Sequence, residues 1–184
     1  MKHKIDLKGA SSFYKNPLFI KNLKRHQVRV LGTVIKIKIC LAFSAGGHRH
    51  QMLQLEGVYG RHEHYFLTFK ERTTKNLKKK AKTYFVTNQE RNPAKAITLF
   101  FESLNIFLKE MPDVVISTGA GVALPTCFFA KLFGKKVIYI ESFSRITEPS
   151  LAGQIAYHFS DLFIVQWKPL LKFYKNAVYG GTIF

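Results

Sequence analysis

Residues 36–48, with the sequence KIKICLAFSAGGH, decide the fold class of this chain. Lys36 and Lys38 alternate with isoleucines and an apolar run follows, which is the pattern of a β-strand entering a protein core. The strand ends at a loop with Gly46 and Gly47, where a helical pattern begins. Glycine lets the main chain approach phosphate oxygens, and the following helix directs free N–H groups and the positive end of its dipole at an anion. The segment therefore predicts a strand, an anion-binding loop and a helix.

A second loop repeats this arrangement. The apolar run 114–117 leads into Ser117-Thr118-Gly119-Ala120-Gly121, and a helical pattern follows as far as Phe133. Neither loop is a nucleotide fingerprint, because the first lacks the Lys-Ser/Thr of a P-loop and neither has the three-glycine spacing of a dinucleotide site. Each could instead be a tight turn in which glycine serves packing only. Together, the two loops favour a ligand that carries a diphosphate.

Short apolar strands alternate with helical patterns from Lys36 onward. Strands are expected at 37–43, 65–69, 84–87, 114–117, 137–141 and 162–165. Helices are expected at 47–56, from Pro93 to before Pro112, up to Phe133, at 151–160 and at 169–174, and the lysine-rich stretch before residue 84 is a helix or a loop. The alternation predicts a doubly wound parallel sheet, an α/β Rossmann-like fold, in one domain at 36–184 with a basic arm at 1–35.

Four connections should meet at one edge of this sheet. Ligands of doubly wound sheets lie outside the carboxyl ends of the strands. The two glycine loops, the turn at 91–93 and the segment 141–145 all follow strands in the sequence. The candidate ligand contacts are Ser44, Gly46, Gly47, His48, Arg91, Asn92, Ser117, Thr118, Gly119, Gly121, Ser142 and Arg145.

Two side chains are candidates for chemistry in this cleft. His48, at a helix N-terminus, could contact a phosphate or accept a proton from an attacking hydroxyl, and it could equally be a cap or a solvated group. Glu141 ends an apolar strand and could bind ligand hydroxyls or act as a base, or form an ion pair with Arg145. Cys40 and Cys127 are interpreted as reduced core thiols.

Metal chemistry has little support in the sequence. Aspartate occurs only at positions 6, 113 and 161, so no Asp-x-Asp sequence is present to hold a divalent ion on a sugar diphosphate. The histidine runs at 48–50 and 62–64 lack the i, i+4 spacing of a helical metal pair. We therefore expect no metal and no cofactor.

The charge of the chain is unevenly distributed. The formal net charge is +18, and residues 1–82 contain 19 Lys and Arg against 4 Asp and Glu. Such an excess suits an anionic lipid leaflet or a nucleic acid. No window of about eighteen apolar residues is present, so a transmembrane helix is not expected. The candidate membrane-surface residues are Phe19, Lys21, Lys24, Arg25, Lys78, Lys79 and Lys80, with a flexible tail and a solvated face as the alternatives.

Five segments, taken in order, resemble those of a known family. They are Ser44 to His48, Pro112 to Gly121 with Pro125, Ile140 to Arg145, Pro149 to Gly153, and Asp161 to Trp167 followed by Tyr179 to Gly181. With them, residues 37–184 resemble the asparagine-linked-glycosylation protein 14 family and its bacterial capsule and exopolysaccharide relatives. The resemblance implies one half of a GT-B glycosyltransferase, similar to the N-terminal, acceptor-binding domain of the transferase that makes lipid II.

The same resemblance implies a division of labour. The sugar-nucleotide half would be a separate chain, and Gly46, Gly47 and His48 would face the diphosphate of a polyprenyl-linked acceptor. Residues 117–121 and 141–145 would line the cleft, and the transfer would need no metal. The C-terminal end would dock the partner chain, with Gln166, Trp167, Tyr179, Gly180 and Gly181 as the contact residues.

We therefore expect a subunit of a UDP-sugar-dependent hexosyltransferase, inactive alone and peripheral on the cytoplasmic face of a membrane. The pathway would be capsular or extracellular polysaccharide or lipid-linked oligosaccharide biosynthesis. The donor would be UDP-N-acetylglucosamine, UDP-galactose or UDP-glucuronate. One alternative is a self-sufficient GT-B-like nucleotide-sugar enzyme that uses His48 and Glu141. The other is a basic nucleic-acid-binding module, which only the charge of the chain suggests; we expect no nucleic-acid partner.

Overall fold

The computed structural model describes residues 37–90 and 92–183. Within them, one sheet of seven parallel strands has the order β3-β2-β1-β4-β5-β6-β7. The strands are β1 Lys38–Ala42, β2 Glu63–Phe69, β3 Lys82–Val86, β4 Val114–Ser117, β5 Lys136–Ile140, β6 Leu162–Val165 and β7 Val178–Tyr179. The predicted doubly wound parallel sheet is confirmed. The predicted arm at 1–35, with Phe19, Lys21, Lys24 and Arg25, lies outside the described residues.

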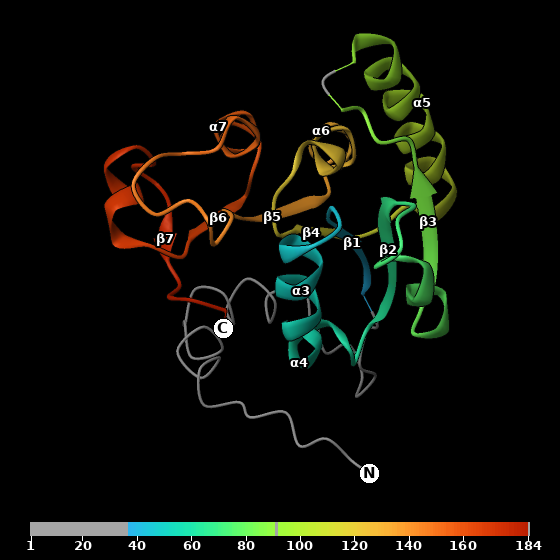
Figure 1. Cartoon of the computed structure of the whole chain (residues 1–184), viewed down its shortest axis with the longest axis horizontal. Coiled ribbons are helices and arrows are strands. Elements are labelled where there is room, and N and C mark those ends of the chain that lie inside the picture. The colour runs from blue at the N-terminus through green and yellow to red at the C-terminus, as the bar shows by residue number, and fades with distance from the viewer. Residues whose placement is uncertain (1–36, 91, 184) are drawn as a thin grey trace.

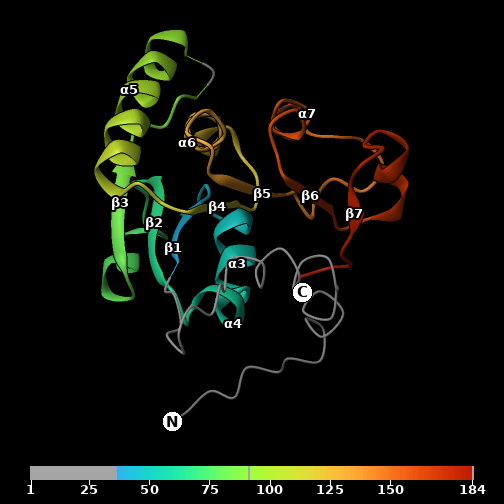
Figure 2. The ribbon, with the colours of Figure 1, turned by 180° about the vertical axis from the view of Figure 1, so that it is seen from behind.

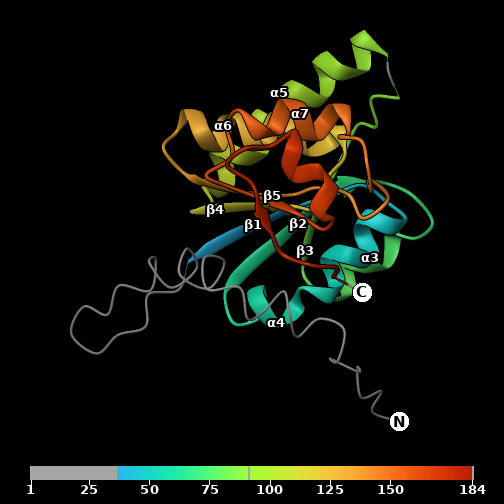
Figure 3. The same ribbon diagram turned by 90° about the vertical axis from the view of Figure 1, so that its left-hand side faces the viewer.

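Helices cover both faces of the sheet (Figures 1 and 3). One face carries α3 Gly47–Gln54, α4 Glu56–Tyr59 and the 3₁₀ turn η1 Lys75–Lys79. The other face carries α5 Pro93–Glu110, α6 Leu124–Leu132, α7 Leu151–Tyr157 and the 3₁₀ turn η3 Lys168–Lys172. Seen from behind, α5 and β7 lie at opposite ends of the sheet (Figure 2). No helix in the described part of the chain is long and apolar enough to cross a membrane.

The strands are buried on both faces, as parallel strands with helices on either side must be. In β1, Ile39 and Leu41 pack toward α3, whereas Cys40 and Ala42 pack toward α5 and α6. Cys40 and Cys127 are free and fully buried, which confirms them as core thiols. Burial raises the pKa of the Cys40 thiol to about 12, so it stays protonated.

Helix α5 is delimited by its own sequence. The side-chain oxygen of Asn92 accepts from the N–H groups of Ala94 and Lys95, Pro93 occupies the first turn, and Met111 ends the helix in a left-handed conformation with φ 42°. The face that packs on the sheet contains Leu99, Ser103, Ile106, Phe107 and Glu110. Four apolar residues of this helix, Ile97, Phe100, Phe101 and Leu108, lie on another face, which is exposed.

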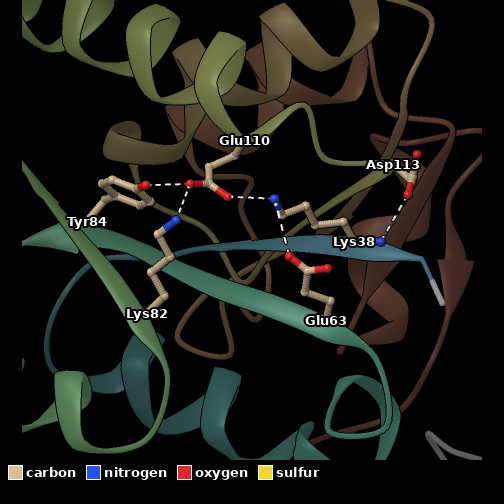
Figure 4. Close-up of polar contacts among 6 residues, drawn as sticks. All are labelled: Lys38, Glu63, Lys82, Tyr84, Glu110 and Asp113. Atoms are coloured by element: carbon tan, nitrogen blue, oxygen red, sulfur yellow. Dashed lines mark hydrogen bonds and ion pairs between the residues drawn. The ribbon is translucent and has the colours of Figure 1, made fainter.

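The last turn of α5 is fixed to the sheet by a buried carboxylate (Figure 4). Glu110 accepts from Lys38 of β1 at 2.7 Å, from Lys82 of β3 at 2.6 Å and from the hydroxyl of Tyr84. Burial alone would raise the pKa of Glu110, but the hydrogen bonds from Lys38, Lys82 and Tyr84 outweigh it and hold that pKa at about 2. The network therefore joins α5 to β1 and β3 at the amino edge of the sheet.

The structure differs from the predicted elements in the shorter segments. The stretch before β3 and the expected helix at 169–174 are both 3₁₀ turns, η1 and η3, and the turn η2 Gly121–Ala123 precedes α6. β7 was not predicted because it has two residues, too few for alternation to be visible. None of these differences moves a strand within the sheet.

The strand order creates a switch point between β1 and β4. From β1 the chain winds outward to β2 and β3, and β4 then returns to the other side of β1, where Ala42 pairs with Ser117. The connections after β1 and β4 therefore leave the sheet in opposite directions. This divergence opens a crevice at the carboxyl ends of the two strands, which is where such sheets bind ligands.

Candidate functional site

A cleft of about 410 Å³ lies at this switch point. All four connections predicted to meet there contribute to it, after β1, β3, β4 and β5. Its polar wall consists of His48, Gln89, Ser142, Ser144, Arg145 and Ser150. Its apolar wall consists of Ala120, Leu124, Leu151, Ala152 and Ile155, with Gly121 between. The cleft thus has a polar part and an apolar part, as an amphipathic ligand requires.

His48 is held in one orientation by the second glycine loop. Its Nδ1 lies 2.7 Å from the carbonyl oxygen of Thr118, and the Thr118 hydroxyl donates to the His48 carbonyl at 2.8 Å. Because a carbonyl only accepts, Nδ1 carries the proton, and in the neutral ring Nε2 is the acceptor. The first and second glycine loops are thereby joined across the switch point. A ring with Nε2 as acceptor is the form that can take a proton from a hydroxyl.

The first glycine loop leaves the N-terminus of α3 uncovered. Gly46 has φ 67°, no side chain caps the helix, and no acidic residue occupies its first turn. A Cβ atom at Gly46 or Gly47 would meet no atom within 4 Å. Within the described residues, no side chain caps the start of α3, where an anion is favoured. Neither Gly46 nor Gly47 lines the cleft, which α3 reaches through His48.

The second glycine loop is shaped by close approaches. Gly119 has φ 110°, and a Cβ there would lie 2.8 Å from the His48 ring. A Cβ at Gly121 would lie 2.2 Å from the Gln89 amide. Ser117 and Thr118 are fully buried, and their hydroxyls bond within the loops instead of lining the cleft. This loop therefore positions His48 and Gln89.

Other predicted ligand residues have different positions. The Asn92 side chain caps α5, and Ser44 donates to the neighbouring Ala45 carbonyl, so neither lines the cleft. Arg91 lies outside the described residues. Gln89, in the same connection as Asn92, is the residue that reaches the cleft. No periodic pattern in the sequence distinguishes these neighbours, because the choice depends on where the chain turns into α5.

Glu141 holds the loop that forms one wall of the cleft. It is fully buried, and its oxygens accept from the N–H of Ser142, from the N–H and hydroxyl of Ser150, and from the hydroxyl of Tyr174. The alternative of an ion pair with Arg145 is not what the structure contains. The carboxylate spans both ends of the loop from Ser142 to Ser150, so its geometry fits a positioning role.

Arg145 brings positive charge to this loop. It is exposed, lines the cleft and has no acidic partner among the residues that the structure describes. Ser142 and Ser144, three residues and one residue before Arg145, share a hydrogen bond of 3.0 Å. A guanidinium beside two hydroxyls and an open helix N-terminus suits phosphate oxygens.

The C-terminal residues predicted to dock a partner are only in part accessible. Gln166 is fully buried, where its amide donates to Gln51 and to the Glu141 carbonyl and its oxygen accepts from the Ile183 N–H. Its side chain therefore cannot contact a partner, which corrects that prediction. Gly180 and Gly181 are buried as well.

Two of these C-terminal residues do reach the surface. Trp167 is half-buried and donates to the Phe143 carbonyl at 2.7 Å. Tyr179 is exposed, with the Lys168 ammonium 5.5 Å from its ring centre. Lys78, Lys79 and Lys80 are exposed at η1, on the α3 face of the sheet.

The cleft also contains residues that were not among the predicted ligand contacts. Gln89, Leu124, Ser150, Leu151 and Ile155 line it. The signal for Ser150 was present in the run Pro149 to Gly153, where Ser150 caps α7 by accepting from the Gly153 N–H. Among the described residues, no three His, Cys, Asp or Glu side chains are grouped as metal ligands.

Similar solved structures share this fold. MurG from Acinetobacter baumannii aligns with a TM-score of 0.59 at 17% identity, covering 72% of this chain and 42% of that chain. UDP-N-acetylglucosamine 2-epimerase from Rickettsia bellii aligns with a TM-score of 0.66 at 12% identity, covering 81% of this chain and 46% of that chain. The fold is thus the Rossmann-like half of a GT-B structure.

Two relatives found by sequence comparison have the same description. The mouse UDP-N-acetylglucosamine transferase subunit ALG14 is 44% identical over 87 residues, which are 44% of this chain and 40% of the mouse protein. The human protein of the same name is 28% identical over 80% of this chain and 83% of its own length. The alignment with the mouse protein therefore spans less than half of that relative.

A family model agrees with these relatives. The model described as "Oligosaccharide biosynthesis protein Alg14 like" matches residues 92–183, which are half of the chain. The match includes the Ser142 to Ser150 loop and the Gly119 loop of the cleft. The chain belongs to the Alg14-like family.

Proposed function

We propose that this chain is the acceptor-binding subunit of a two-chain glycosyltransferase in lipid-linked oligosaccharide biosynthesis. Its cleft takes a polyprenyl-diphosphate-linked sugar, and a separate chain supplies the sugar nucleotide. The observation that carries the proposal is the cleft itself, which is lined by His48, the second residue of α3, and by Arg145. Membership of the Alg14-like family supports the same reaction class.

The diphosphate is assigned to the polar part of the cleft. The N–H groups at the start of α3 and the Arg145 guanidinium supply hydrogen bonds and positive charge without a metal. The hydroxyls of Ser142 and Ser144 add further donors. The glycine loops allow this approach because no Cβ atom stands at Gly46 or Gly47.

The proposed transfer is a displacement at the anomeric carbon of the donor sugar. An acceptor hydroxyl forms the new glycosidic bond, the bond from the sugar to UDP breaks, and UDP leaves with the electron pair. His48 Nε2 takes the hydroxyl proton, because Nδ1 is already committed to the Thr118 carbonyl. Glu141 acts through the loop that it holds and does not itself contact the substrate.

The second chain is proposed because the relatives are described as subunits. Within the described residues, the sheet of this chain forms one Rossmann-like unit. The relatives are named as subunits of a UDP-N-acetylglucosamine transferase, which favours UDP-N-acetylglucosamine over UDP-galactose and UDP-glucuronate as the donor. The exposed residues Tyr179 and Trp167 remain candidates for the partner contact. We place the complex at the cytoplasmic face of a membrane, where such an acceptor is embedded.

The test is transfer of radiolabelled sugar from each of the three UDP-sugars to a short-chain polyprenyl-diphosphate-linked N-acetylglucosamine. The chain alone is compared with the chain plus the protein that copurifies on its tag. Transfer by the pair alone supports the proposal, and transfer by the isolated chain favours a self-sufficient enzyme. The Arg145→Ala variant should lower kcat/KM at least about tenfold, and Arg61→Ala, an exposed arginine before β2, is the matched control.

A further inference from the structure

The longest helix of the chain presents an apolar face to solvent. Ile97, Phe100, Phe101 and Leu108 of α5 are exposed, as is Met111 directly after it, and Ile97 and Phe101 are more than 60% exposed. Positions three, four, seven and eleven residues apart share one side of a helix. The buried side of α5 is a different one, formed by residues such as Leu99 and Ile106. The helix therefore has two apolar sides, one packed on the sheet and one exposed to solvent.

The exposed apolar face of α5 continues onto α6. Phe128, Leu132 and Phe133 are 44%, 66% and 43% exposed. The Phe100 ring lies 6.4 Å from the Phe128 ring, and Phe107 lies 5.4 Å from Phe133, so the two helices form one surface. Exposed apolar side chains that are contiguous in this way mark an interaction site.

The same surface reaches the cleft through α7. Leu151 is 74% exposed and Ile155 is 44% exposed, and both line the apolar part of the cleft with Leu124 of α6. Helices α5, α6 and α7 lie side by side on one face of the sheet (Figure 3). An apolar tail attached to a ligand in the cleft would therefore meet a continuous apolar path over these helices.

We propose that this α5–α6–α7 surface contacts an anionic lipid leaflet, an inference that rests on the proposed function. The three helices lie on one face of the sheet, and α5 extends past the sheet (Figures 1 and 2). Exposed aromatic and aliphatic side chains on such a surface suit insertion among acyl chains. The net charge of +18 suits an anionic leaflet. The η1 lysines, Lys78 to Lys80, lie on the opposite face of the sheet and are not part of this contact.

The test locates the contact with single labels on the full chain. Cys40 and Cys127 are fully buried, so a polarity-sensitive fluorophore reacts with a newly introduced exposed cysteine. The Phe101→Cys and Leu132→Cys variants place the label on the surface, and Glu56→Cys places it on α4, across the sheet. Vesicles of equal parts phosphatidylcholine and phosphatidylglycerol carry a spin-labelled lipid that quenches inserted fluorophores.

A blue shift and quenching at 101 and 132, but not at 56, is the expected result. In the double variant Ile97→Glu/Phe101→Glu, the partition coefficient onto these vesicles should fall at least about tenfold, since two apolar side chains leave the membrane. Equal quenching at all three positions, or none at 101 and 132, would overturn the inference. So would a doubled solution mass that the double variant abolishes, because the surface would then join two copies of the chain.

The outcome is separable from that of the proposed function. Transfer to the short-chain acceptor in solution tests the cleft and the partner without a bilayer. Vesicle insertion tests the surface without a donor or a partner. Transfer with no insertion would overturn this inference alone, and insertion with no transfer would overturn the proposed function alone.

Discussion

Replacing Glu110 with glutamine should destabilise the fold in a pH-dependent way. Glu110 is 5% exposed and accepts from Lys38, Lys82 and Tyr84, and its pKa falls from 4.5 to about 2. Each pKa unit corresponds to about 1.4 kcal/mol of free energy of unfolding. Because Lys82 is more than half exposed and screened by solvent, we expect about 2 to 3 kcal/mol of destabilisation by Glu110→Gln at pH 7.

The sign of the pH dependence follows from the depressed pKa. The stabilisation from Glu110 is complete above the unfolded-state pKa of 4.5 and is lost as the pH falls through that value toward 2. The difference between wild type and Glu110→Gln should therefore shrink by roughly 40% between pH 7 and pH 3.5. The assay is urea unfolding at both pH values, followed by circular dichroism, with the m-value checked for constancy.

The matched control is Glu90→Gln, which removes an exposed ion pair with Lys95. Its two side chains are 61% and 45% exposed, so the free energy of unfolding should change by less than about 1 kcal/mol. The reasoning is refuted if Glu110→Gln costs no more than this control at pH 7. A cost that is the same at pH 3.5 would refute the assignment to the ionised carboxylate.

Three further substitutions probe the walls of the cleft. Gly119→Ala should lower the free energy of unfolding by about 1 to 3 kcal/mol in a urea titration, because the new Cβ lies 2.8 Å from the His48 ring and φ is 110°. The control is Gly134→Ala, where φ is 68° and a Cβ meets nothing within 4 Å among the described residues, and its free energy of unfolding should fall less. Glu141→Gln places an amide donor against the Ser150 and Tyr174 hydroxyls and should cost about 1 to 3 kcal/mol in urea unfolding and reduce transfer by the pair; unchanged stability would contradict the buried network. His48→Gln should lower kcat of the pair by a larger factor than it raises KM. A rise in KM with kcat unchanged would show that His48 binds substrate and does not transfer a proton.

Much of the fold could be predicted because several of its strands are short apolar runs bounded by loops, as buried parallel strands are. The runs 114–117 and 162–165 coincide with β4 and β6, and the glycine loops mark the ends of β1 and β4. Both loops meet at the switch point, which follows from the winding of a parallel sheet. The convergence of the four connections was therefore predictable from order alone.

The individual roles of the side chains were harder to predict, because they depend on local geometry. Asn92 and Gln89 are three residues apart, yet Asn92 caps α5 and Gln89 lines the cleft. Gln166 is polar and was expected at a docking surface, but it is buried with its side chain satisfied by three hydrogen bonds, to Gln51, to the Glu141 carbonyl and from the Ile183 N–H. The helical period of α5 showed that an apolar face exists and not whether it meets the core or solvent.

The central claim is that the cleft holds the acceptor diphosphate while the donor belongs to another chain. Calorimetric titration of the isolated chain with a short-chain prenyl-diphosphate-linked N-acetylglucosamine, and separately with UDP-N-acetylglucosamine, tests it most directly. We predict binding of the acceptor, weakened at least about tenfold in the Arg145→Ala variant, and no binding of the UDP-sugar. Binding of the UDP-sugar with none of the acceptor would contradict the claim.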